Sequence, residues 1–180
     1  MFVFFKRSLR TLMAELLYNK GKLFAWFLKK LGGIKVDRNN YDFNFMGELI
    51  KVVDKGGVGL VFPESRIPKP DEKRPLPFKP SFVYIALEAN APIIPVYTNG
   101  QYHKKGERAR VMIGEKIDLF EVLDGREINK ENIDFLCQYV ENKIISLGEL
   151  LNEKEKEINN IDNVEFIRSD ANEIEHIASK

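Results

Sequence analysis

The sequence predicts an α/β fold in which a mainly parallel sheet is flanked by helices. Short apolar runs, typical of buried strands, alternate along the chain with segments whose apolar residues recur every three or four positions, as in amphipathic helices. Strands separated by helices favour crossover connections, which leave the strands parallel. With 180 residues, 44% of them hydrophobic, the chain is long enough to bury a core of its own.

The first sixty residues are predicted to hold three helices and two strands. Apolar spacing indicates helices over residues 9–17 and 23–31, and a pair of glycines ends the second helix. The other elements are a strand over residues 34–36, a helix over residues 42–54 that Asp42 caps, and a strand over residues 58–62 that is buried on both faces.

Prolines mark the middle of the chain. Residues 63–79 contain five of them among many charged side chains, which indicates an irregular loop. Pro80 is well placed at the entry to a helix over residues 82–87. After this helix the pattern predicts buried strands over residues 93–97 and 109–113 and a longer amphipathic helix over residues 131–151.

We predict one domain over residues 1–151, followed by an acidic tail. Residues 152–180 are acidic and rich in asparagine with little periodicity, which indicates a frayed helix or a tail. The single cysteine, Cys137, excludes an internal disulfide and a multi-cysteine metal site, and it is interpreted as a small buried residue on a helix.

Charge is distributed unevenly along the chain, although the net charge is only +1. Residues 1–40 carry a net charge of +7, and residues 121–180 carry a net charge of −8. A basic front half suggests an anionic partner, and ordinary solvated helix faces are the alternative. No stretch approaches the roughly 18 apolar residues of a spanning helix, so we expect a cytoplasmic protein that touches a membrane.

Phe62-Pro-Glu-Ser-Arg66 is the strongest local signal. A strand stops at a proline and delivers a carboxylate, a hydroxyl and a guanidinium into a turn. The planar guanidinium of Arg66 matches the oxygens of a phosphate, backbone N–H groups of the turn add donors, and Glu64 is expected to orient the turn or the arginine. The alternative is a Glu–Arg surface pair that contributes little.

Two further cations are candidates for the same site. Arg38 follows the strand over residues 34–36, and the carboxyl ends of parallel strands are where ligands sit in such sheets. A cap or local pairing with Asp37 is the alternative for Arg38. Lys79 precedes a helix whose first turn attracts anions, although it also fits a solvated loop lysine.

Three blocks, taken in order, resemble the lysophospholipid acyltransferase family, which makes phosphatidic acid from 1-acylglycerol 3-phosphate. Residues 23–38 are similar to the second block of the family, which ends in an arginine. Residues 62–66 resemble its third block, usually Phe-Pro-Glu-Gly followed by an arginine, and residues 91–96 resemble its fourth, a Pro-x-x-Pro-Val strand entry. Residues 75–80 fall where bacterial members carry a Phe-Lys, and the resemblance covers roughly residues 8–150.

The resemblance implies a glycerophospholipid acyltransferase-like fold and the transfer of a fatty acyl group to the hydroxyl of 1-acylglycerol 3-phosphate. The donor would be an acyl-CoA or acyl carrier protein thioester acting as co-substrate, with no bound cofactor and no metal. Partners would be the lysophospholipid, the acyl donor and the inner face of a membrane, and not a nucleic acid. The residues that map to the glycerol-phosphate site are Arg38, Glu64, Ser65 and Arg66, with Lys79 a weaker candidate.

The chain departs from the family pattern in three places. Ser65 replaces the usual glycine, which matters if that position needs a positive φ. A lysine frequent in the second block is absent near Glu15. Family members also carry a His-x-x-x-x-Asp box ahead of the second block, whose histidine removes the proton of the attacking hydroxyl, and this chain has none.

The two histidines do not replace that box. His103 is followed five positions later by Arg108, and His176 lies four residues from the end, so both are interpreted as surface histidines. We expect the 180 residues to be inactive, and we expect the box upstream of Met1, which would then be an internal or misassigned start of an N-terminally truncated chain. An in-frame stop codon upstream of Met1, with no such box before it, would contradict this expectation.

Other interpretations of the chain remain open at this point. The alternative function is that of a non-catalytic binder of anionic lipid or phosphate that keeps the pocket without the base. The aromatic residues within 23–31 fit either core packing or a helix lying in a membrane interface, because lysines flank them. Base stacking on a nucleic acid is the least favoured interpretation.

Overall fold

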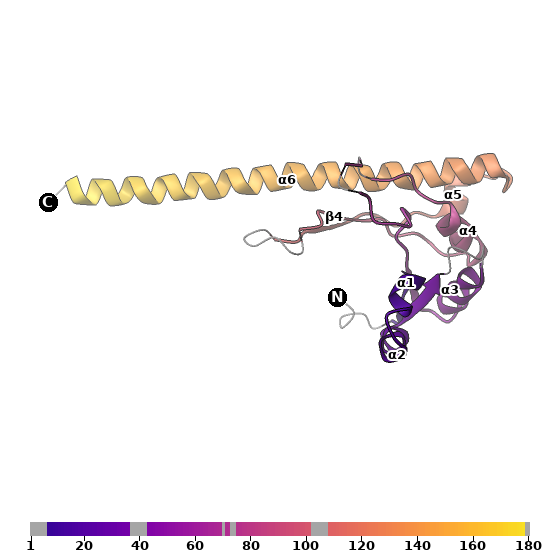
Figure 1. Cartoon of the computed structure of the whole chain (residues 1–180). Helices are drawn as coiled ribbons and strands as arrows, with labels where there is room; N and C mark the ends of the chain where they lie inside the picture. Colours follow the sequence, from indigo (N-terminus) through magenta and orange to yellow (C-terminus); the bar gives the residue numbers. More distant parts are fainter. Residues whose placement is uncertain (1–6, 37–42, 70, 73–74, 102–107, 179–180) are drawn as a thin grey trace. The chain divides into compact units, whose positions relative to one another are not determined.

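The computed structural model describes residues 7–36, 43–69, 71–72, 75–101 and 108–178, with side chains up to residue 157. The chain divides into two compact units (Figure 1). The first comprises Met1–Ile93 and Lys116–Glu141, and the second comprises Ile94–Glu115 and Asn142–Lys180. The predicted boundary between residues 151 and 152 stays a prediction.

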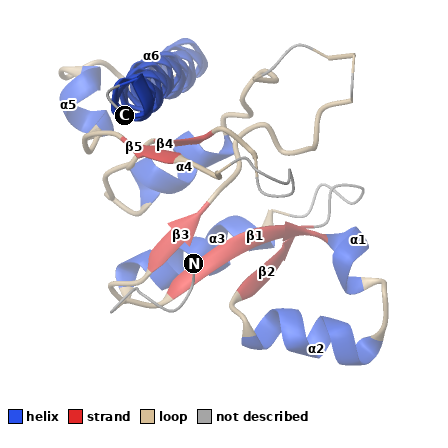
Figure 2. Cartoon of the chain, turned by 90° about the vertical axis from the view of Figure 1, so that its left-hand side faces the viewer, coloured by secondary structure: helices blue, strands red, loops and turns tan. Residues whose placement is uncertain are grey.

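A three-stranded parallel sheet forms the centre of the first unit (Figure 2). Its strands are β1 (Leu9–Ala14), β2 (Gly33–Val36) and β3 (Val58–Leu60), in the order β2-β1-β3. Both pairs are parallel. The predicted fold class, a mainly parallel sheet with flanking helices, is therefore confirmed.

Helix α3 (Asn44–Asp54) covers one face of this sheet (Figure 2). The core of this unit includes a cluster of three buried side chains, Ile34, Leu49 and Ile85. Half-buried apolar side chains pack around this cluster. Gly59 of β3 allows this packing, because a Cβ there would lie 2.9 Å from a methyl carbon of Leu49. The helix predicted from residue 42 thus begins at Asn44, while its predicted cap, Asp42, lies outside the described residues.

The prediction of a helix over residues 9–17 was wrong. Leu9–Ala14 is the central strand β1, and only Glu15–Tyr18 is helical, as α1. An apolar run this short suits either structure, and here pairing with strands on both sides decides the outcome. By contrast, α2 (Lys22–Lys30) confirms the second predicted helix, and β2 confirms the strand after it.

The strand predicted over residues 58–62 is shorter and less buried than expected. It ends at Leu60, its residues are half-buried, and Phe62 is 64% exposed. The chain then follows the predicted irregular path through the proline-rich loop and enters α4 (Ser81–Glu88) with Pro80 as its N-cap residue. Helix α5 (Leu119–Leu123), which the sequence analysis did not predict, begins where the Asp118 carboxylate accepts hydrogen bonds from two backbone N–H groups.

The second unit contains an antiparallel pair of strands, β4 (Val96–Thr98) and β5 (Val111–Ile113). They lie where strands were predicted, but Val96 is exposed, so the expected full burial was wrong. Helix α6 (Lys130–Ala178) contributes its residues from Asn142 onward to this unit, and Gly148 lies against the ring of Tyr97. This helix confirms the one predicted over residues 131–151 and continues through the segment described above as a frayed helix or a tail.

Candidate functional site

The carboxyl ends of β2, β1 and β3 lie at one edge of the parallel sheet, where ligand sites form in such folds. Strand β3 leads directly to the segment containing Glu64, Ser65 and Arg66. Strand β2 ends at Val36, and Arg38, the candidate just beyond it, lies outside the described residues. The loop after β3 is therefore the part of the candidate site that lies among the described residues.

Backbone hydrogen bonds fold residues 62–66 into two successive tight turns. The Ser65 N–H donates to the carbonyl of Phe62 at 3.0 Å, and the Arg66 N–H donates to the carbonyl of Glu64 at 2.8 Å. The far end of the loop returns to this point, because the Lys79 N–H donates to the carbonyl of Pro63 at 2.8 Å. Residues separated by sixteen positions are thereby held together.

Ser65 lies in the left-handed region of backbone space, with φ of 58°. Glycine adopts this conformation freely, whereas a residue with a Cβ is strained there by roughly 1 kcal/mol or more. The suggestion that this position needs a positive φ is therefore confirmed. Serine occupies a site in the turn that favours glycine.

Replacing Ser65 with glycine is expected to raise the free energy of unfolding. Relief of the left-handed strain outweighs the greater entropy of glycine in the unfolded chain, for a net gain of about 0.5–1 kcal/mol. Chemical denaturation of Ser65→Gly measures this gain.

Ser146→Gly is the matched control for that substitution. Ser146 lies inside α6, where glycine costs about 0.5–1 kcal/mol, so the control should shift in the opposite direction. Equal destabilisation by the two substitutions would show that the Ser65 side chain makes a contact worth more than the strain.

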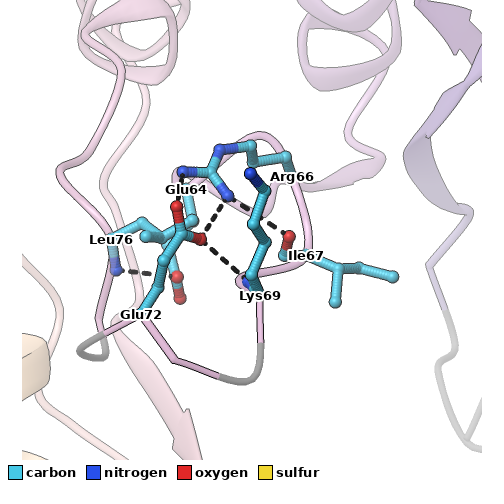
Figure 3. Close-up of polar contacts among 6 residues, drawn as sticks. All are labelled: Glu64, Arg66, Ile67, Lys69, Glu72 and Leu76. Carbon is cyan, nitrogen blue, oxygen red and sulfur yellow. Dashed lines mark hydrogen bonds and ion pairs between the residues drawn. The ribbon is translucent and has the colours of Figure 1, made fainter.

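Glu64 holds the loop through a backbone hydrogen bond, and its charge is, after the hydrogen bond to Glu72, a minor cause of the raised pKa of Arg66. One of its carboxylate oxygens accepts a hydrogen bond from the backbone N–H of Leu76 at 2.9 Å (Figure 3). Leu76 is buried, so this contact ties the turn to a fixed point of the loop. Of the two expected roles for Glu64, orienting the turn and orienting the arginine, the geometry supports the first.

Arg66 presents its guanidinium as a two-pronged fork to the carboxylate of Glu72 (Figure 3). Nη1 lies 2.6 Å from one oxygen, and Nη2 lies 2.8 Å from the other. The backbone N–H of Lys69 also donates to this carboxylate, at 2.8 Å. The carboxylate thus sits where a ligand anion with two oxygens would meet the same fork.

This pairing fixes the charge state of both partners. Hydrogen bonds from Arg66, and then from the Lys69 N–H, lower the pKa of Glu72 to about 2. The hydrogen bond to Glu72 is the main cause that raises the pKa of Arg66. Because the folded pKa of the carboxyl is depressed, the pair is fully charged above the ordinary carboxyl pKa and is lost only as the pH falls toward 2.

Two lysines among the described residues of this loop are exposed. Lys79 is brought to the turn through its backbone, and its side chain is exposed, as is that of Lys69. Sequence reasoning missed both Lys69 and Glu72, because contacts across an irregular loop leave no periodic signal. An acidic residue six positions after the arginine, inside the same loop, is the one signal that was present.

The described part of the chain offers no competing chemical centre. Cys137 is buried on α6 and its thiol lies 3.7 Å from the carbonyl of Phe78. Burial, followed by Glu141 and Asp134, raises its pKa to about 11, so it is a neutral thiol at pH 7 and the structural interpretation holds. No cluster of three metal-ligating side chains occurs among the described residues, and the side chains of both histidines lie outside them.

Two comparisons with known proteins found matches to acyltransferases. A family model described as Acyltransferase matches residues 1–99, which is more than half of the chain. The chain is also similar to the crystal structure of the 1-acyl-sn-glycerophosphate (LPA) acyltransferase PlsC from Thermotoga maritima, with 26% identity and a TM-score of 0.53. The similarity covers 78% of this chain and 56% of the other. Comparison with the curated proteins found no match.

Proposed function

The chain belongs to the acyltransferase family, and from this premise we propose that it acts in phospholipid biosynthesis on 1-acylglycerol 3-phosphate. The reaction joins the acyl group of an acyl-CoA or acyl carrier protein thioester to the lysophospholipid hydroxyl and gives phosphatidic acid. The partners proposed are the lysophospholipid, the acyl donor and a membrane surface on its cytoplasmic side.

The fork of Arg66 is the observation that carries this proposal. A phosphate monoester presents two oxygens in the geometry that the Glu72 carboxylate already occupies, with greater negative charge. Phosphate would displace Glu72 and take the two guanidinium donors. The exposed side chains of Lys69 and Lys79 would supply further positive charge beside it.

The remaining candidates are proposed to support this arginine. Glu64 holds the turn through Leu76, and the left-handed Ser65 directs the chain so that Arg66 leaves the turn toward Glu72. Arg38 is proposed to approach the same phosphate from the end of β2. The proposed reaction is direct attack of the acceptor hydroxyl on the thioester carbonyl. This step needs a general base and a positioned acceptor.

A second candidate function is a non-catalytic binder of anionic lipid or phosphate. It is favoured by one observation, namely that neither histidine of the 180 residues is followed by an aspartate five positions later. Binding of 1-acylglycerol 3-phosphate, measured by calorimetry, tests the acceptor site common to both candidates. Affinity no greater for this ligand than for its phosphate-free analogue would contradict both, whereas phosphatidic acid formation separates the catalytic candidate from the other.

Glu72→Gln is expected to tighten the binding of 1-acylglycerol 3-phosphate by about two- to fivefold, the range typical of an exposed ion pair. The amide no longer competes as an anion for Arg66, so less interaction is lost when phosphate arrives. Since the pKa of Glu72 is about 2, its carboxylate is ionised at both pH 5 and pH 8, and tighter binding by the variant should be seen at both. Titration calorimetry at the two pH values measures it.

Glu155→Gln provides the control for this substitution. Glu155 pairs with Arg110 at 3.6 Å in the second unit, so its loss should leave the affinity unchanged. Weaker binding by Glu72→Gln would instead mean that Glu72 holds the loop in its binding conformation.

A further inference from the structure

Helix α2 exposes an apolar face, within which Lys30 is the one charged side chain of the helix. Leu23 is 80% exposed and Trp26 is 58% exposed, while Phe24, Phe27 and Leu31 are also exposed. At 100° per residue these side chains share one side of the helix, and four of them line an apolar depression. The helix contributes only Leu28 as a fully buried residue.

Core packing therefore does not explain this face within the described residues. The helix already meets β2 and α1 through its other side, where Leu28 is 7% exposed. Neighbouring α1 adds Leu16, which is 71% exposed. The nine residues of α2 and its C-cap residue, Leu31, thus expose five large apolar side chains. Exposed apolar patches of this kind mark interaction sites.

Positive charge accompanies the patch. Lys22 and Lys29 lie beside Trp26 on the helix circumference, and the Lys30 ammonium lies 5.8 Å from the centre of the Trp26 ring. Lysine stems can follow the apolar surface while their ammonium groups reach the phosphate level of a bilayer. Residues 1–40 as a whole carry a net charge of +7. A complementary partner would therefore offer an apolar layer to the aromatic and leucine side chains and anionic groups to the lysines.

The helix is suited to lie in the plane of a bilayer and not to cross it. Nine residues span about 13 Å, against the roughly 30 Å of hydrocarbon in a membrane. In the part of the chain that the structure describes, no helix is long and apolar enough to cross a membrane.

We propose that the apolar face of α2, with Lys22, Lys29 and Lys30, docks on the surface of an anionic phospholipid bilayer. Trp26 and Phe27 enter the interface between headgroups and acyl chains, and the lysines pair with lipid phosphates. The proposal deepens the proposed function, since it names the surface by which an enzyme of lipid substrates would reach them. Lipid docking needs neither substrate nor turnover. A test of docking is therefore independent of the role proposed for Arg66.

Trp26 is the single tryptophan of the chain and reports directly on this face. Adding vesicles of phosphatidylcholine and phosphatidylglycerol in equal parts is expected to shift its emission to the blue, and brominated acyl chains are expected to quench it. Vesicles of phosphatidylcholine alone should bind several-fold more weakly, and salt should reduce the difference. An unchanged emission spectrum at saturating anionic lipid would overturn the proposal.

Substitutions then locate the contact. Leu23→Asp is expected to lower vesicle co-sedimentation at least tenfold, whereas Ile128→Asp, at an exposed apolar site outside α2, should not. Lys29→Gln with Lys30→Gln should weaken anionic binding by about fivefold per lysine. The matched control is Lys51→Gln, in α3, with Lys55→Gln, at the C-cap of α3. Circular dichroism confirms that each variant is folded.

Two outcomes besides an unchanged spectrum would contradict the proposal. A blue shift that grows with protein concentration in the absence of vesicles would assign the face to a second copy of the chain. Equal loss of co-sedimentation in the α2 variants and in their controls would place the lipid contact elsewhere.

Discussion

Incubation of these 180 residues with 1-acylglycerol 3-phosphate and acyl-CoA is expected to yield no phosphatidic acid above the uncatalysed rate. The attacking hydroxyl must lose its proton as it adds to the thioester carbonyl, and a positioned general base contributes roughly 10²- to 10⁴-fold to such a step. The sequence holds no histidine with an aspartate five positions later, and Cys137 is a buried neutral thiol. Product analysis with a radiolabelled acyl donor measures the rate.

A binding measurement on the same preparation is the control for this experiment. The chain should bind 1-acylglycerol 3-phosphate while failing to acylate it, which separates a missing base from a misfolded protein. Multiple turnovers by the 180 residues would show that another group serves as the base.

Arg66→Ala is expected to weaken the binding of 1-acylglycerol 3-phosphate by on the order of 10- to 100-fold. The substitution removes two charge-assisted donors in a fixed fork, and such bonds are the strong ones in anion recognition. Arg66→Lys should recover only part of the affinity, because an ammonium cannot offer the two parallel donors. Titration calorimetry measures both.

Arg110→Ala is the matched control for Arg66→Ala. It also removes an arginine paired with a glutamate, but it lies in the second unit and outside the loop after β3. Its affinity for the ligand should equal that of the wild type. If Arg110→Ala and Arg66→Ala weaken binding equally, the effect is one of net charge and not of a specific site.

Much of the fold follows from local pattern, and the exceptions have physical reasons. Prolines predicted the loop before α4, and the glycine pair predicted the end of α2. Periodicity alone does not identify β1, because a short apolar run such as Leu9–Ala14 suits a helix equally well until strands pair on both of its sides. The burial of β3 and β4 was overestimated because apolar composition does not reveal which elements cover a strand.

The sequence predicted candidate residues for the site but not the contacts that they make in the structure. The need for a positive φ at Ser65 could be anticipated from the glycine usual in the family, and the turn has that conformation. The partner of Arg66 could not, since Glu72 reaches it through an irregular loop whose course depends on tertiary contacts such as that of Leu76. In the same way, an amphipathic pattern does not distinguish a core helix from an interfacial one, whereas the exposure of Trp26 shows that this side chain is not packed in the described core.

The most direct test of the proposed acceptor site is a thermodynamic cycle in which Arg66→Ala is combined with removal of the ligand phosphate. Affinities of wild type and variant are measured for 1-acylglycerol 3-phosphate and for 1-acylglycerol. If Arg66 holds the phosphate, the substitution weakens binding of the first ligand by on the order of 10- to 100-fold and leaves binding of the second unchanged. Equal weakening for both ligands would contradict the assignment of the loop after β3 as the phosphate site.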